Sequence, residues 1–265
     1  MSGFDLDRIG GRRALDNLVD VVLRAGQEAL QIQNAGFDVD IKEDESPVTQ
    51  ADRAVEELIG AHVRKVWPSA AFLGEETGSS DGDALRFVVD PIDGTRAFMR
   101  GLDTWSVLVG LEWEKEPVVG IAFLPAAGDL FVGVIGGGAY VNGRPCRLSK
   151  VDALERSLVG HGGLEQFTAS GLESLLPAMA KATFTQRGLA DFANYAALLR
   201  GQMDAVIDPG VKPYDIAPAA VLIREAGGRL TDLKGERTIY GGAALASNSK
   251  LHEALVAMVG RSIED

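Results

Sequence analysis

RFVVDPIDGTRAF, residues 86–98, joins a hydrophobic strand to a turn that carries two aspartates. Asp90 ends the apolar run and Asp93 follows across Pro91 and Ile92, so a tight turn can direct both carboxylates and the Ile92 carbonyl into one space. Two carboxylates this close repel each other unless a cation lies between them, and hard oxygen ligands suit Mg²⁺ or Mn²⁺. An Asp-Pro and Asp-Gly turn uses the same residue types for backbone hydrogen bonds and a positive φ. Taken alone, the stretch favours the turn.

Length and composition limit the class of protein. At 265 residues the chain is long enough for one large domain or two closely packed lobes. The single cysteine, Cys146, excludes an intramolecular disulfide, and the first residues lack the apolar run of a secretory signal. No stretch approaches the roughly 18 consecutive apolar residues that span a bilayer. With 26 basic against 38 acidic residues, the chain lacks the cationic excess that neutralises nucleic-acid phosphates. We therefore predict a cytoplasmic protein with neither a membrane nor a nucleic acid as partner.

The periodicity of apolar residues changes along the chain. Helical spacing over residues 12–34, and again after the SPVT segment at 46–49, predicts two amphipathic helices. From Phe87 to Val141, short β-rich runs separated by Gly, Pro, Asn and Asp are typical of an antiparallel sheet. From about Ser157, helical and strand patterns alternate, which favours an α/β lobe. The pattern predicts two adjoining lobes, residues 1–150 and 151–265, with a site in the cleft between them.

Other acidic residues have ordinary local explanations. Glu75 and Glu76 follow a short apolar run, where a solvated loop is the default. Thr49 is placed as the N-cap of the second helix, with Asp52 at its third position. Asp215 stands immediately before an apolar helix, as an N-cap would. Each residue taken singly is better explained as a loop or cap residue, and only the joint pattern indicates a site.

That joint pattern consists of segments in a particular order: KEDESPVTQAD (42–52), GEE (74–76), DPIDGT (90–95), WSVLVGL (105–111) and PYDIAPAAVLIREAGG (213–228). In this combination the chain resembles the inositol monophosphatase family of metal-dependent phosphatases, over nearly its whole length. It is most similar to the histidinol-phosphate phosphatase branch, through DGTRAF, RGLADFANYAALLRG and KPYD. The resemblance implies the family fold, an α-β-α-β-α layered sandwich with an antiparallel sheet in the first lobe and an α/β second lobe. It also implies a homodimer.

The resemblance further implies roles for individual residues. Two or three Mg²⁺ ions, replaceable by Mn²⁺ and sensitive to competing Li⁺, would be held by Glu75, Asp90, the Ile92 carbonyl, Asp93 and Asp215. The positions that orient or deprotonate the attacking water are matched by Asp52, Glu75 and Thr95. Lys42 matches the lysine of a mobile loop near the more weakly held metal, whereas Glu76 has no firm assignment. The substrate would contact Lys42, Asp93, Gly94, Thr95, Arg96, Asp191 and Asp208.

Substrate choice depends on the carboxylates near the leaving group. Asp191 and Asp208 match positions that contact the alcohol part of the substrate in relatives, and two carboxylates there favour a cationic amino alcohol. Inositol hydroxyls could also donate to these oxygens. A second phosphate would require further cations, for which Arg96 is one candidate, although a surface arginine is the simpler explanation. We predict a Mg²⁺-dependent phosphatase of L-histidinol phosphate, with inositol 1-phosphate as the second candidate substrate and a 3′,5′-bisphosphate nucleotide as the third. A regulatory binding protein that keeps the fold is the alternative from another class.

Overall fold

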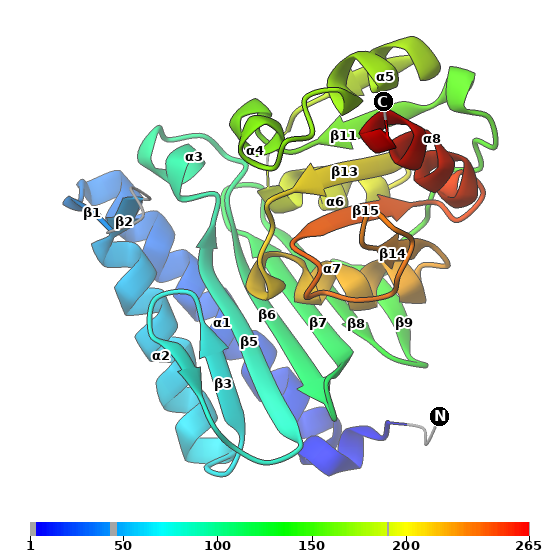
Figure 1. Cartoon of the computed structure of the whole chain (residues 1–265). Helices are drawn as coiled ribbons and strands as arrows, with labels where there is room; N and C mark the ends of the chain where they lie inside the picture. Colours follow the sequence, from blue (N-terminus) through cyan, green and yellow to red (C-terminus); the bar gives the residue numbers. More distant parts are fainter. Residues whose placement is uncertain (1–3, 43–46, 190, 265) are drawn as a thin grey trace.

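An eight-stranded sheet organises the first part of the chain (Figure 1). The computed structural model describes residues 4–42, 47–189 and 191–264, so residues 43–46 of the KEDESPVT segment and Ala190 lie outside the described residues. Neighbouring strands are antiparallel except for β3 and β5, which run parallel. In spatial order the strands are β10 (Arg144–Pro145), β9 (Gly138–Val141), β8 (Asp129–Val134), β7 (Glu116–Leu124), β6 (Ser106–Trp113), β5 (Leu85–Asp93), β3 (Ala71–Gly74) and β4 (Gly78–Ser80). The antiparallel sheet predicted from Phe87 to Val141 is confirmed.

Two long helices cover one face of this sheet, where the helical periodicity predicted them. They are α1 (Gly11–Ala35) and α2 (Gln50–Val66), preceded by the short helix η1 (Leu6–Ile9) and joined by the paired strands β1 (Val39–Ile41) and β2 (Pro47–Thr49). Their buried faces pack on the sheet in one apolar cluster, which includes Leu18, Val55 and Ile59 from the helices and Phe87 and Val109 from the strands. Thr49 caps α2 as predicted, because its hydroxyl accepts a hydrogen bond from the Ala51 amide at 3.1 Å.

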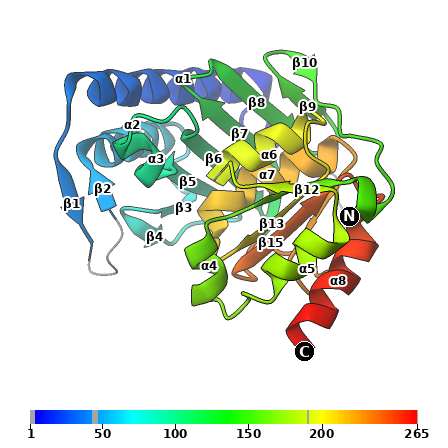
Figure 2. The same ribbon diagram turned by 90° about the horizontal axis from the view of Figure 1, so that it is seen from above.

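A second, five-stranded sheet lies on the other side of a central helix layer, and Figure 2 shows the resulting five layers from above. The central layer holds α6 (Asp191–Leu199) and α7 (Pro213–Glu225), which pack against both sheets in one cluster. The outer layer holds α4 (Leu164–Ala169), α5 (Leu175–Ala182) and α8 (His252–Glu264). The strands, in spatial order, are β12 (Thr185–Arg187), β11 (Leu158–His161), β13 (Ala205–Pro209), β15 (Ala243–Ser247) and β14 (Arg229–Thr231). The predicted α-β-α-β-α sandwich is therefore confirmed.

Helix α7 lies unusually close to the large sheet because two strands present glycines beneath it. A Cβ at Gly110 would lie 2.7 Å from the Ala217 Cβ, and a Cβ at Gly120 would lie 2.4 Å from the Pro218 carbonyl oxygen. Neither distance is compatible with a side chain. The glycines thus allow the helix to settle on β6 and β7, with its first turn beside the end of β5.

None of the helices in the described part of the chain combines the length and the hydropathy that a membrane crossing requires.

Candidate active site

The ends of two neighbouring strands bring the first acidic residues together. Because β3 and β5 are parallel, their carboxyl ends meet at the same edge, and the Glu75 amide donates to the Val89 carbonyl at 3.2 Å. The pairing of β5 with β6 shifts register between Asp90 and Asp93, so the strand is irregular at the DPID turn. A cleft of about 770 Å³ opens at this edge. Its lining includes Glu75, Asp90, Ile92, Asp93, Gly94, Thr95, Arg96, Asp191, Asp208 and Asp215.

Asp90 lies at the centre of this acidic group. Its side chain is buried, and its Oδ1 atom has no hydrogen-bond partner among the described residues. Burial raises the pKa of Asp90 well above its ordinary value, and the charges of Glu75, Asp93 and Asp215 raise it further. A buried oxygen without a partner, surrounded by other carboxylates, is what a bound cation would satisfy.

Asp93 is held by one residue of its own sheet and one residue of the second lobe. The Phe192 amide and the Ser106 hydroxyl both donate to its Oδ2 atom at 2.8 Å. Burial raises the pKa of Asp93 well above its ordinary value, and the charges of Asp191 and Asp215 raise it further. Since one oxygen takes both hydrogen bonds, these contacts fix the orientation of the carboxylate as a whole.

Asp215 is not the N-cap of α7, so the prediction that it occupies this position is wrong. The helix begins at Pro213, with Lys212 as the N-cap, because proline has the required φ and needs no amide partner at that position. Asp215 is the third helical residue, and the Lys212 amide donates to its Oδ2 atom at 2.7 Å. Burial raises the pKa of Asp215 to about 7, and the charges of Glu75 and Asp191 raise it as well.

Asp52 combines the two roles that the sequence presents as alternatives. Its Oδ2 atom completes a capping box by accepting from the Thr49 amide at 2.8 Å and the Thr49 hydroxyl at 2.6 Å. Its Oδ1 atom lies 3.3 Å from the Thr95 hydroxyl, which also lies 3.2 Å from the Ile92 carbonyl oxygen. The cap therefore aims the other oxygen of Asp52 at the turn that carries Thr95.

Lys42 contacts the glutamates that follow β3. Its ammonium lies 3.0 Å from Glu75 Oε1 and 2.6 Å from Glu76 Oε1. Burial lowers the pKa of Lys42, but the hydrogen bonds and charges of Glu76 and Glu75 outweigh that effect and leave the pKa above its ordinary value. Among the described residues, no three His, Cys, Asp or Glu side chains already surround a common metal position. The carboxylates of Glu75, Asp90, Asp93 and Asp215 nevertheless line one cleft.

Glu56 on α2 positions this loop, and the sequence interpretation missed it. Its carboxylate is buried and accepts from the amides of Glu76 at 2.9 Å and Thr77 at 2.8 Å. A Cβ at Gly74 would lie 2.5 Å from Glu56 Oε1, so the glycine makes room for the carboxylate. The position of Glu56 in the sequence could have indicated this role. It falls on the apolar face of the helix with Asp52 and Val55, and a buried acidic side chain needs hydrogen-bond partners.

The opposite wall of the cleft is also acidic. Asp208 is buried, its Oδ2 atom accepts from the Tyr195 hydroxyl at 3.2 Å, and burial together with Asp215 and Asp191 raises its pKa to about 7. Burial likewise raises the pKa of Asp191. The positive charge of Arg96 partly offsets this increase, and the negative charge of Glu165 adds to it. Tyr195 and Glu165 line the cleft without having been predicted there.

Arg96 lies at the exposed rim of this wall. Its guanidinium is 3.7 Å from the Glu165 carboxylate, and both side chains are mostly exposed. The arginine is thus within ion-pair distance of a carboxylate of the same cleft.

Comparisons with known proteins agree with this arrangement. The chain matches the inositol monophosphatase family over residues 13–264. It is 34% identical over 249 residues to the histidinol-phosphatase of Mycobacterium tuberculosis, covering 92% of this chain and 94% of that protein. It is 31% identical over 264 residues to an inositol-1-monophosphatase of Mesorhizobium japonicum, covering 95% and 98%. Among solved structures, the Thermotoga maritima IMPase superposes with a TM-score of 0.86 at 27% identity, covering 94% of this chain and 98% of that one.

Proposed function

Because the chain belongs to the inositol monophosphatase family, and so is a phosphoric monoester hydrolase, we propose that its substrate is L-histidinol phosphate, hydrolysed to histidinol and phosphate. The observation that carries this choice is the charge of the cleft. Among the residues that the structure describes, seven acidic and three basic side chains line it. Metal ions would neutralise the carboxylates of the proposed ligands. The other carboxylates, those of Glu165, Asp191 and Asp208, would face the leaving group.

The acidic wall supports a cationic leaving group. Asp208 and Asp191 come from different elements of the second lobe, and Glu165 adds a third carboxylate at the rim. An ammonium donates a charge-assisted hydrogen bond to a carboxylate, and such a bond is worth roughly 1.5–3 kcal/mol. A neutral alcohol would make weaker contacts with the same oxygens.

The donor set at the strand ends fits a hard divalent cation. Glu75, Asp90, Asp93, Asp215 and the Ile92 carbonyl would hold Mg²⁺, since all supply oxygen and the Oδ1 atom of Asp90 has no partner among the described residues. When bound, the metal would make a water nucleophilic at neutral pH and stabilise the charge that develops on the phosphoryl and leaving oxygens.

The side chains around Thr95 would orient the attacking water. The Thr95 hydroxyl lies within reach of Asp52 Oδ1 and the Ile92 carbonyl oxygen, so it can donate to either acceptor, and Thr95 lines the cleft. A water in the cleft would donate to that hydroxyl, and Glu75 would accept the other proton. Because the capping box fixes Asp52, the acceptor is in place before the substrate binds.

Inositol 1-phosphate is the second candidate substrate. Tyr195 and Asp208 place a hydroxyl and a carboxylate side by side, which suits the hydroxyl groups of a polyol. A bisphosphorylated substrate ranks third, because the acidic wall that contains Glu165 would repel a second phosphate placed beside Arg96.

A phosphate-release panel with Mg²⁺ tests the proposal. It compares kcat/KM for L-histidinol phosphate, inositol 1-phosphate, adenosine 3′,5′-bisphosphate and fructose 1,6-bisphosphate. We expect histidinol phosphate to be preferred, and Asp208→Asn to reduce that preference by about tenfold, the equivalent of one charge-assisted contact. A higher kcat/KM for inositol 1-phosphate would overturn the substrate assignment. Inactivity on all four would favour a regulatory protein that keeps the fold.

A further inference from the structure

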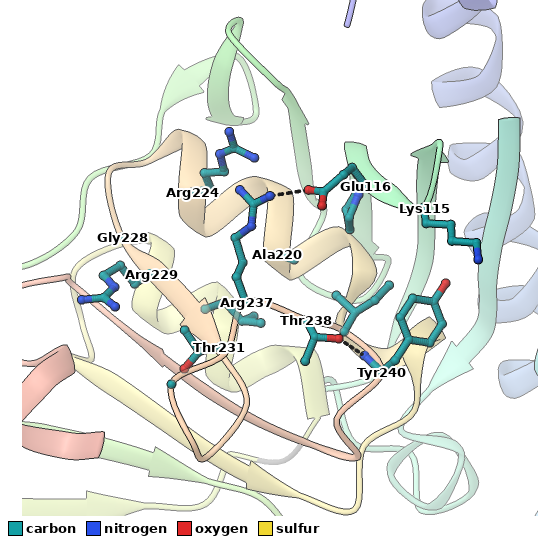
Figure 3. Close-up of a pocket in the computed structure, with 14 residues that line it drawn as sticks. Lys115, Glu116, Ala220, Arg224, Gly228, Arg229, Thr231, Arg237, Thr238 and Tyr240 are labelled. Atoms are coloured by element: carbon teal, nitrogen blue, oxygen red, sulfur yellow. Dashed lines mark hydrogen bonds and ion pairs between the residues drawn. The ribbon is translucent and has the colours of Figure 1, made fainter. Parts of the chain in front are cut away.

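A second cavity, of about 430 Å³, shares no lining residue with the acidic cleft (Figure 3). It lies between the turn that joins β6 to β7, the second half of α7, strand β14 and the loop that follows β14. Its volume is in the range of small-molecule sites, which is about 300–1,000 Å³. No step of the hydrolysis uses these residues.

The charge of this cavity is opposite to that of the rest of the chain. Among the described residues, four basic side chains (Lys115, Arg224, Arg229 and Arg237) line it, and Glu116 supplies the single carboxylate. The chain as a whole carries a net charge of −12. A concave cluster of cations on an acidic protein attracts small anions to one place.

Two of these cations have carboxylate partners, and two are available to a ligand. Arg237 pairs with Glu116, as Figure 3 shows, and Arg229 pairs with Glu253. In the part of the chain that the structure describes, neither Arg224 nor Lys115 lies within ion-pair distance of a carboxylate. Exposed ion pairs contribute only about 0–1 kcal/mol, so an anion could also draw Arg237 away from Glu116.

Part of the remaining lining is apolar and suits an organic group. The floor of the cavity carries Pro117, Ala220, Leu230 and Ile239. The Tyr240 side chain stands at the rim, 48% exposed, with its hydroxyl donating to Glu112 Oε2 at 2.7 Å. That hydrogen bond fixes the ring, whose face is available for stacking.

We propose that this cavity binds a small organic phosphate, with Arg224 and Arg237 holding the phosphate and the apolar residues and Tyr240 holding the organic group. Guanidinium groups present paired N–H donors that match phosphate oxygens, and several cations around one site suit a dianion. The cavity is separate from the catalytic cleft. Asp215 and Arg224 stand nine residues apart on α7, which corresponds to about 14 Å along the helix axis.

Removing the metals separates the two sites experimentally. In EDTA the catalytic cleft retains its excess of carboxylates and repels anions, whereas the second cavity keeps its positive charge. Calorimetric titration of the metal-free protein with adenosine 5′-phosphate should show one saturable site. Inorganic phosphate should bind more weakly, because it lacks the organic group. No saturable binding of the nucleotide at millimolar concentration would overturn the proposal, and equal affinity for the two probes would overturn the role of the apolar floor.

Matched arginine variants locate the binding. Arg224→Ala should weaken the affinity for adenosine 5′-phosphate by about tenfold or more, the loss expected for one charge-assisted contact. Arg64→Ala removes an exposed arginine of α2 and should leave the affinity unchanged. With Mg²⁺ restored, Arg224→Ala should hydrolyse phosphate monoesters like the wild type. Binding that does not respond to Arg224→Ala, or that responds equally to Arg64→Ala, would refute the site.

Discussion

Replacing Glu56 with glutamine tests how the metal-binding edge is built. The buried carboxylate accepts from the amides of Glu76 and Thr77, and both hydrogen bonds involve a charged acceptor. Glutamine keeps one acceptor oxygen, but its side-chain NH₂ group would face the backbone N–H of Glu76 or Thr77, which is also a donor. Losing one such bond in a buried position costs about 1.5–3 kcal/mol. For a chain of this size we expect a fall in Tm of about 3–12 °C, since 1 kcal/mol corresponds to about 2–4 °C.

The same substitution should change the metal requirement of the enzyme. Glu56 holds the loop from which Glu75 reaches the cleft, so loosening the loop misplaces a proposed ligand without removing it. Changes to groups that orient metal ligands typically cost about 10–100-fold in metal affinity or activity. We expect half-saturation by Mg²⁺ at a concentration about tenfold higher, with activity largely recovered when Mg²⁺ is in excess.

The neighbouring residue provides a matched control. Glu57 on the same helix is exposed and pairs with Arg64 at 2.8 Å, so Glu57→Gln should change the free energy of unfolding by less than about 1 kcal/mol. The assays are thermal unfolding in EDTA and phosphate release over a Mg²⁺ titration. If Glu56→Gln behaved like Glu57→Gln in both assays, the loop would not depend on this carboxylate.

Three further predictions concern the site, the pH dependence of stability and the packing of the layers. Asp93→Asn should reduce phosphate release by more than about 100-fold at saturating Mg²⁺ with an unchanged near-UV circular dichroism spectrum, and activity close to wild type would contradict its role as a ligand. His252 is buried between Thr231 and Ser247, and burial lowers its pKa to about 4. The unfolded chain therefore binds more protons between pH 6.5 and 4, and stability should fall as the pH falls through that range by up to about 3 kcal/mol; a His252→Gln variant with the same pH dependence in urea unfolding would refute this. Gly120→Ala should destabilise the fold by about 1–3 kcal/mol or more because its Cβ would press on Pro218, whereas Gly260→Ala, with open space around it on α8, should be neutral or stabilising in the same measurement.

Local pattern was enough to predict much of the architecture. The amphipathic periodicity before Val66, the turn residues from Phe87 to Val141 and the alternation after Ser157 each correspond to elements of the structure. Such patterns can be recognised in the sequence because the spacing of side chains on one face of a helix or strand depends on that element alone. The exception at the start of α7 is also local: Pro213 outweighed Asp215 as the signal for where the helix begins.

The sequence alone determined which residue types were present for metal and phosphate chemistry, and the order in which they follow one another. Only the tertiary structure decided that Asp52 faces Thr95, that Glu56 supports the loop of Glu75, and that α7 lies against Gly110 and Gly120 with Asp215 beside Asp90. It also decided that cations of distant segments line a second cavity. The physical reason is that burial, electrostatic repulsion and close approach depend on which elements pack together, and no single segment contains that information.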